Sequence, residues 1–349
     1  MILRQVSPES ESIFDLILTL YRVSKGNWED LARKASVSSE HARLFLEYAV
    51  QFLGNLGNYK GFGDSKFVPR CPKEAITALS SVDEKAKGLC ERSIEAIYAD
   101  EKKPGLLHLG YPDKGHLSSY YPNSPDIIQS EIEEVDKIVG NKGLLPENTR
   151  LRKTKDGNYE VLIASGVSNP PSEDQDAPDG PWILPSGKTV SLVFGDHQEE
   201  MAKAALNMKQ AAKHATNDTE KAMLEAYSKS FATGSLEAFK ESQRRWVEDI
   251  GPTVETNIGF IETYRDPAGV RAEWEGFVAL VNKEQTLKFN KLVKAAPQMI
   301  PKLPWSKDFE KDEFTPPDFT SIEILSFPCS GPPVGINVRS IYILSTIIS

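Results

Sequence analysis

Residues 251–282 decide the fold of this chain, and they read GPTVETNIGFIETYRDPAGVRAEWEGFVALVN. Two runs rich in β-branched and aromatic residues surround the turn signal Asp266-Pro267, so the stretch predicts two strands joined by a turn. A carboxylate on an apolar strand face is costly to bury alone, so Glu262 is expected to meet a cationic partner or a ligand. Because side chains alternate along a strand, that face is expected to carry Val254, Ile258, Phe260, Glu262 and Tyr264.

The second strand is expected to run from Glu273 to Val281. The same alternation places Glu273 and Glu275 on one face, together with Phe277. The hairpin is therefore expected to present several carboxylates where a buried strand would carry apolar groups.

The sequence on both sides of the hairpin predicts a mixture of helices and short strands. Apolar residues at helical spacing predict three helices in 10–57, further helices in 72–98, 126–139 and 284–299, and three more in 196–250. Short strands are expected in 149–165, 181–195 and 320–328, and a polar, Pro-rich loop in 168–180. Clustered strands among helices favour an α+β fold over an alternating α/β fold.

Several helix starts carry capping signals. Asn27, with Asp30 three residues later, and Ser38 or Ser39 are expected to cap two of the N-terminal helices. Asp196 with Glu199, and Asn217 with Glu220, have the spacing of capping boxes.

The bulk composition excludes several classes of protein. A formal net charge of −9 argues against a nucleic-acid binder, which would carry basic patches. The three cysteines, Cys71, Cys90 and Cys329, are scattered and form no metal or disulfide pattern, which suits a reducing cytosol. The first residues predict no signal peptide, and no apolar run reaches the roughly 18 residues of a membrane-spanning helix.

Three separated segments are distinctive, namely NYKGFGDSKFVP at 58–69, the hairpin at 251–282 and GPPVGIN at 331–337. In this order they resemble the dipeptidyl peptidase III family of zinc aminopeptidases, peptidase family M49. The resemblance extends from about Ser7 to Asn337. One departure is Val334, where the family pattern leads us to expect Ala.

The resemblance implies a fold and a division into domains. Residues 1–282 would form a lower, substrate-binding domain built on a β-barrel with flanking helices. Residues 283–319 would be a short helical excursion into the upper domain. Residues 320–337 would return as a strand and the substrate-strand motif, and 338–349 match nothing in the family.

The resemblance also implies roles for Glu262 and Tyr264. Glu262 would receive the N-terminal ammonium of a peptide, since a desolvated carboxylate selects a cation. Tyr264 would be catalytic, donating a hydrogen bond to the oxyanion that develops during attack. The alternative from the residues alone is that Glu262 pairs with Arg265 or Arg271 and that Tyr264 is an aromatic at the rim of a barrel.

Further substrate-binding residues follow from the same comparison. Phe62 and Glu275 would line the pockets for the first two peptide residues, although Phe62 also fits a core aromatic and Glu275 a solvated strand face. Pro333, Val334 and Gly335 would pair with the extended peptide as an edge strand, and a Pro-rich turn is the alternative. Asn337 matches an asparagine of the family that helps to hold the N-terminus of the substrate.

A zinc site is not expected within this sequence. The family motif His-Glu-x-x-Gly-His lies downstream of the position that matches Asn337, and this sequence ends at Ser349. The nearest local candidate, His197 followed by Gln-Glu-Glu, has Met201 where a second ligand would stand. The chain has five histidines, and none of them is expected to bind metal: His41, His108, His116, His197 and His214.

The last residues, 338–349, are β-branched and apolar, a composition typical of aggregation-prone strands. We interpret them as translated intron or a mispredicted gene end, because Val338-Arg339 can be encoded by GTAAGA, a splice-donor sequence. A continuous exon through Ser349 in the transcript would contradict this interpretation.

These observations predict a truncated, catalytically incomplete member of the family. The intact enzyme would be a cytoplasmic, monomeric zinc metallopeptidase that removes dipeptides from the N-termini of short peptides. This chain would bind peptides but no zinc, nucleic acid or membrane. The alternative, from another functional class, is a non-catalytic peptide-binding or interaction protein made as a short isoform.

Overall fold

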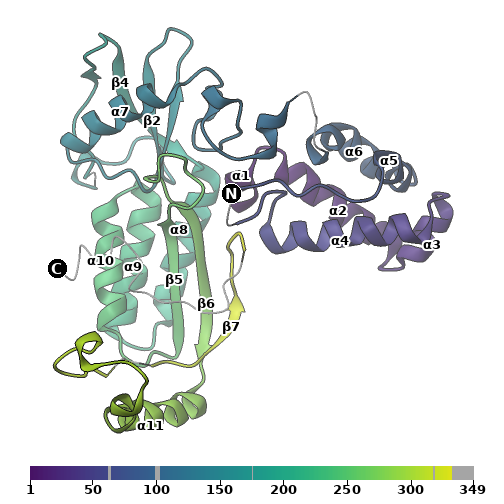
Figure 1. Ribbon diagram of the computed structural model, residues 1–349. Helices are drawn as coiled ribbons and strands as arrows, with labels where there is room; N and C mark the ends of the chain where they lie inside the picture. Colours follow the sequence, from purple (N-terminus) through teal and green to yellow (C-terminus); the bar gives the residue numbers. More distant parts are fainter. Residues whose placement is uncertain (62–63, 99–102, 175, 317–318, 332–349) are drawn as a thin grey trace.

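The computed structural model describes residues 1–61, 64–98, 103–174, 176–316 and 319–331. Helices and strands are mixed, as the sequence predicts. Along the chain, Figure 1 shows a helical N-terminal part, a sheet with its helix, and a long hairpin beside three helices. Short 3-10 helices occur between these elements, at Pro104–Leu107 (η1), Pro112–Lys114 (η2), Ser172–Asp174 (η3), Ala212–His214 (η4), Ile300–Lys302 (η5) and Lys307–Phe309 (η6).

The N-terminal part is a bundle of short and medium helices. They are α1 (Ile2–Val6), α2 (Ser10–Ser24), α3 (Trp28–Lys34), α4 (Ser39–Asn55), α5 (Lys73–Ser80) and α6 (Glu84–Ile97). The apolar faces of α2 to α6 form one buried cluster, in which Leu16, Phe45 and Phe52 are fully buried. The predicted caps are confirmed, because Asn27 accepts from the Asp30 amide at 3.0 Å and Ser38 from the His41 amide at 3.1 Å.

A four-stranded sheet with one covering helix follows in the chain. Its strands are β1 (Thr149–Lys153), β2 (Tyr159–Ala164), β3 (Trp182–Ile183) and β4 (Thr189–Asp196), in the order β1-β2-β4-β3. Only β2 and β4 pair in parallel. Helix α7 (Gln129–Asn141) buries Ile132 and Val135 against Leu151 and Val161 of the sheet.

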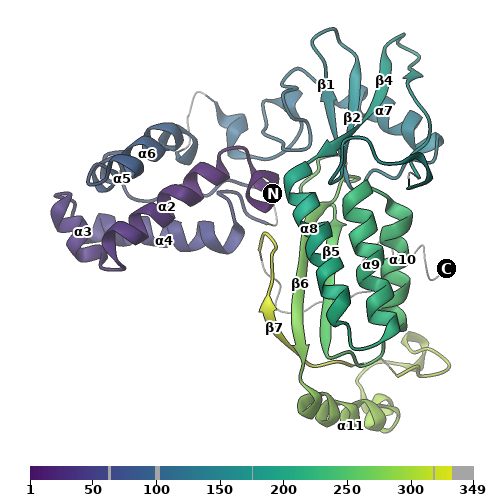
Figure 2. The ribbon, with the colours of Figure 1, turned by 180° about the vertical axis from the view of Figure 1, so that it is seen from behind.

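The hairpin predicted from residues 251–282 is present. Strands β5 (Val254–Glu262) and β6 (Glu273–Val281) pair antiparallel, and β7 (Ile322–Ser326) extends the sheet on the other side of β6. Helices α8 (Gln198–Ala211), α9 (Asp218–Thr233) and α10 (Leu236–Glu248) lie alongside it (Figure 2). Phe231 of α9 and Trp274 of β6 are both buried at this junction, with ring centroids 4.8 Å apart.

Helix α11 (Lys283–Met299) leads away from the end of β6 and is seen at the bottom of Figure 1. Asn282 caps it by accepting from the Gln285 amide at 3.0 Å. The interpretation of 283–319 as an excursion into an upper domain stays a prediction.

The expected β-barrel is not confirmed. Within the described residues, the four-stranded and the three-stranded sheets are both open. Helices and loops, rather than a continuous ring of strands, connect the two sheets in the chain.

One predicted cap is wrong. Asp196 does not cap α8, since the residue at the cap position is His197, which adopts a left-handed backbone conformation. The Asp196 carboxylate instead accepts from Nε of Arg150 at 2.7 Å, a contact between residues far apart in sequence. By contrast, Asn217 caps α9 as predicted, accepting from the Glu220 amide at 2.7 Å.

The N-terminal helix α1 also contacts the hairpin directly. The Gln5 side chain accepts from the Trp274 amide at 2.6 Å and donates to the Trp274 carbonyl at 3.2 Å. Trp274 is opposite Phe260 of β5, and its main-chain N–H and C=O groups point away from β5. The amide of Gln5 therefore occupies a short piece of the β6 edge that β7 does not reach.

Candidate functional site

An irregularity in β5 changes the face on which Glu262 lies. Phe260 is opposite Trp274, but the next pair is Glu262 with Glu273, so one extra residue is inserted at Ile261. Directly paired residues share a face of an antiparallel sheet. The expectation that Glu262 follows Ile258 and Phe260 is therefore wrong, and Glu262 joins Glu273 and Glu275 instead.

The three glutamates on this face form the acidic cluster of the hairpin, defined by Glu262, Glu273 and Glu275. Burial, followed by the charges of Glu273 and Glu262, raises the pKa of Glu275 to about 7. Burial also raises the pKa of Glu262, against the opposing effect of a hydrogen bond from Tyr264. Glu275 is half-buried.

The arginines near the hairpin have other partners than Glu262. Arg265 pairs with Glu273, at 3.3 Å between Nε and Oε1. Arg271 pairs with Asp136 at 2.6 Å and with Asp266 at 3.8 Å. In the described part of the chain, Arg265 is thus the cation that pairs with the acidic cluster, against three carboxyl groups.

Tyr264 lies close to Glu262, and its hydroxyl opposes the effect of burial, which raises the pKa of the Glu262 carboxyl. The Tyr264 side chain is 52% exposed, which leaves the ring accessible from solvent. Glu262 is half-buried, so a partly desolvated carboxyl group and an accessible phenol lie together here.

Described residues of the 58–69 segment and the residues just before the 331–337 segment lie next to the acidic cluster of the hairpin. Ser330, just before the Gly331–Asn337 segment, donates to Oε2 of Glu273 at 2.8 Å. Gly61 lies against Ser330, because a Cβ on Gly61 would stand 3.3 Å from the Ser330 carbonyl oxygen. Five of the predicted substrate residues lie outside the described residues: Phe62, Pro333, Val334, Gly335 and Asn337.

Comparison with known proteins identifies the family. Residues 89–342, more than half of the chain, match the model of Peptidase family M49. The chain belongs to this family.

Two curated relatives give the extent of the similarity. Dipeptidyl peptidase 3 from Dictyostelium discoideum is 43% identical over 340 residues, and that from Homo sapiens is 38% identical over 353 residues. Each match covers 97% of this chain and 47% of the relative. The M49 chain thus spans about half the length of the curated relatives it matches.

A solved structure titled DPP III from Caldithrix abyssi is also similar. It is 18% identical, with a TM-score of 0.48, and the match covers 94% of this chain and 48% of that one.

The histidines of the M49 chain do not provide a zinc site in the described residues, where no three His, Cys, Asp or Glu side chains gather in a metal-binding arrangement. His197 lies 3.7 Å from Asp196, and burial lowers its pKa to about 4. The rings of His108 and His116 are tilted relative to each other, with centroids 5.9 Å apart. These residues do not fit a metallopeptidase centre, so we derive no step through a metal.

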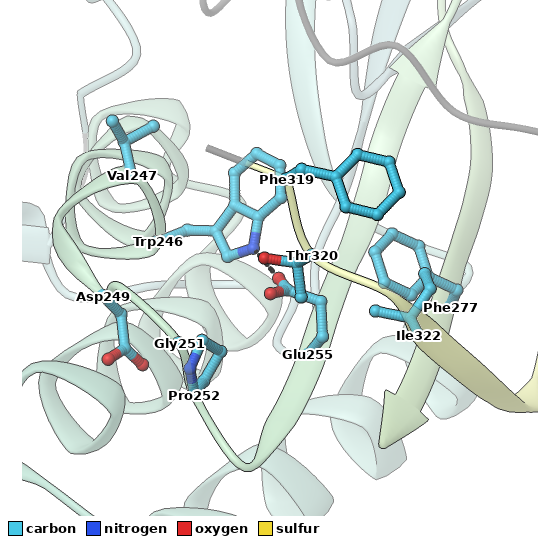
Figure 3. A pocket seen from close by; sticks show the side chains of 10 residues that line it. All are labelled: Trp246, Val247, Asp249, Gly251, Pro252, Glu255, Phe277, Phe319, Thr320 and Ile322. Carbon is cyan, nitrogen blue, oxygen red and sulfur yellow. Dashed lines mark hydrogen bonds between the residues drawn. The ribbon is translucent and has the colours of Figure 1, made fainter. Parts of the chain in front are cut away.

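A separate cavity of about 380 Å³ lies at the other end of the hairpin. Trp246 of α10 donates to Glu255 of β5 in its wall, and Phe277 and Phe319 line it from other segments (Figure 3). Among the described residues that the sequence predicts for peptide binding, Glu262, Tyr264 and Glu275 do not line it. We therefore place the candidate site at the acidic cluster and not in this cavity.

Among the helices that the structure describes, none is long and apolar enough to cross a membrane.

Proposed function

We propose that this chain provides the peptide-binding part of a dipeptidyl peptidase III, an enzyme that removes dipeptides from the N-termini of oligopeptides. The observation that carries the proposal is the excess of carboxyl groups on one face of the hairpin. Glu262 and Glu275 have raised pKa values, and Arg265 forms its ion pair with Glu273.

An N-terminal ammonium would complete this charge arrangement. A cation placed between Glu262 and Glu275 favours their ionised forms and offsets the cost of burying them. Charge-assisted hydrogen bonds from the ammonium to the carboxylates would then fix the end of the peptide. An acetylated peptide has no such charge and would leave the cost of burial in place.

The other residues of this chain that are predicted to contact the substrate extend this proposal. Tyr264 would donate to the oxyanion during cleavage, and Phe62 would contact the first peptide residues. Pro333, Val334 and Gly335 would pair with the extended peptide backbone, and Asn337 would contact its N-terminus. The domain boundaries predicted from the sequence, with 1–282 as the lower domain, belong to the same proposal.

Zinc would supply an activated water in the intact enzyme. We assign no residue of this chain to the metal. What this chain contributes in the proposal is the binding and orientation of the peptide.

The proposal is tested by calorimetric titration of the purified chain with a tetrapeptide and its N-acetylated form. The free peptide is expected to bind at least about tenfold more tightly, because a hydrogen bond to a charged group contributes about 1.5–3 kcal/mol. Equal affinities would contradict the role of the acidic cluster.

Catalysis is tested separately by release of a dipeptide from a dipeptidyl-naphthylamide, with zinc added and then chelated. We expect no release by this chain. Chelator-sensitive release would show that residues of this chain hold zinc and would overturn our interpretation of its histidines.

A further inference from the structure

Arg265 lies at the meeting point of three segments that are far apart in sequence. Its side chain is only 1% exposed. Nη1 donates to the Lys60 carbonyl at 3.5 Å, and Nε donates to the Ser330 hydroxyl at 3.3 Å. It therefore contacts the 58–69 segment, the hairpin and the residues that precede the 331–337 segment.

The contacts with Glu273 and Ser330 close a triangle. Nε of Arg265 is 3.3 Å from Oε1 of Glu273, and the Ser330 hydroxyl donates to Oε2 of the same carboxylate at 2.8 Å. Each member of the triangle thus contacts both others. Such a closed set holds Ser330 more firmly than a single hydrogen bond would.

The neighbouring backbone leaves little room for Ser330 to move. A Cβ at Gly61 would stand 3.3 Å from the Ser330 carbonyl and 3.8 Å from Nη2 of Arg265, so this close approach favours glycine. Cys329, the residue before Ser330, is 3% exposed. Burial, followed by the charges of Glu275 and Glu273, raises the pKa of its thiol to about 12.

We propose that Arg265 is a positioning residue, which together with Glu273 and Ser330 holds Cys329–Gly331 against the acidic cluster. Ser330 is thereby held at a fixed point beside Glu273. Arg265 acts on the peptide through Ser330 and Glu273, and not by touching it. The consequence for peptide binding rests on the proposed function, whereas the tether itself can be tested without any ligand.

The test uses Cys329 as a reporter of local opening. The purified 349-residue chain is treated with a maleimide, and the labelling rates of Cys71, Cys90 and Cys329 are followed by peptide mass mapping. All three thiols are buried, so each reacts only when its surroundings open. Cys71 and Cys90 report on the N-terminal helices, away from the tether.

In Arg265→Met the labelling rate of Cys329 is expected to rise about tenfold, while the rates of Cys71 and Cys90 stay within about twofold. Arg265→Lys keeps the charge but not the fork of donors, so it should restore part of the protection. The matched control is Arg150→Met, since Arg150 also forms an ion pair with a carboxylate, Asp196, but in the other sheet.

A folded Arg265→Met chain with unchanged Cys329 labelling would overturn the proposal. An equal rise in Arg150→Met would do the same, because the effect would then be general loosening. If Arg265→Met does not fold, Ser330→Ala decides, as it removes only the bridging hydroxyl. It should raise Cys329 labelling about threefold, and no rise in this variant would contradict the tether.

A second measurement connects the tether to the ligand. The ratio of the affinities for free and acetylated tetrapeptide is expected to fall several-fold in Arg265→Met. If the wild-type chain shows no such preference, the proposed function fails, while the labelling of Cys329 still tests the tether.

Discussion

Two neighbouring parts of the β5–β6 hairpin, the turn and the acidic cluster beside it, use the same residue types in opposite ways. At the turn, Arg271 is fully buried and paired with Asp136 and Asp266, and the Tyr121 hydroxyl also donates to Asp266 at 2.8 Å. A few residues away, the acidic cluster has Arg265 as its pairing cation.

The difference in charge balance explains a difference in the pKa values. Burial alone would lower the pKa of Arg271, but Asp136 and Asp266 hold it above its usual value. In the acidic cluster, by contrast, the pKa values of the Glu262 and Glu275 carboxyl groups are raised, mainly by burial. The turn is thus stabilised in the free protein, whereas the cluster is stabilised further only when a cation arrives.

The largest expected effect is at the turn. Arg271→Met leaves the buried carboxylates of this network uncompensated, and we expect a loss of about 3–5 kcal/mol in the free energy of unfolding. Urea denaturation measures it. Glu275→Gln is the control within the cluster and should not destabilise the chain at pH 7. Equal stability of Arg271→Met and the wild type would remove the contrast between the turn and the acidic cluster.

The next effect is on ligand binding. Glu262→Gln keeps the shape of the side chain and removes its charge, so the free tetrapeptide is expected to bind about tenfold to a hundredfold more weakly. The acetylated peptide should bind as before. A parallel loss for both peptides, measured by calorimetry, would indicate a general structural effect rather than recognition of the ammonium.

The pH dependence of stability gives the third prediction. The pKa of Glu275 is raised from 4.5 to about 7 in the folded chain, so its favourable contribution is complete below about pH 4.5 and is lost as the pH rises through 7. For this half-buried group we expect a loss of about 1–2 kcal/mol.

Urea midpoints at pH 5 and pH 8 measure this loss. Glu275→Gln should remove this part of the pH dependence and leave the rest. If the wild type and Glu275→Gln have parallel pH profiles, Glu275 is not the group responsible.

The smallest effect is expected for Tyr264→Phe. In the wild type, the Tyr264 hydroxyl lowers the pKa of Glu262. The variant lacks this hydroxyl, so the pKa of Glu262 should rise and peptide binding should require a slightly higher pH. We expect a change in affinity of less than about fivefold at pH 7, corresponding to about 1 kcal/mol or less. A loss as large as that of Glu262→Gln would mean that Tyr264 contacts the peptide in the bound state.

Local signals in the sequence predicted the local structure well. The hairpin, the helices and the caps at Asn27, Ser38 and Asn217 depend on residues within a few positions of one another, and each is confirmed. The cap at Asp196 failed because Arg150, which is 46 residues away in sequence, binds that carboxylate. A spacing rule contains no information about such a partner.

The sequence singled out residues of the candidate site, whose roles stay predictions, but it did not predict their arrangement. Strict alternation put Glu262 beside Phe260, whereas the extra residue at Ile261 places it with Glu273 and Glu275. No feature of the sequence signals this insertion, since it depends on how β5 pairs and on what Ile261 contacts. The role of Arg265 was missed for a similar reason, because its partners Lys60 and Ser330 lie 205 and 65 residues away in sequence.

The contact between Gln5 and Trp274 has a consequence for association between molecules. An exposed strand edge is a template on which a foreign strand can add. At Trp274 both main-chain groups already have a partner in the Gln5 amide, so an approaching strand must first displace a group of the same chain. The N-terminal helix thus acts as an internal competitor that keeps this edge, beside the acidic cluster, from promiscuous pairing.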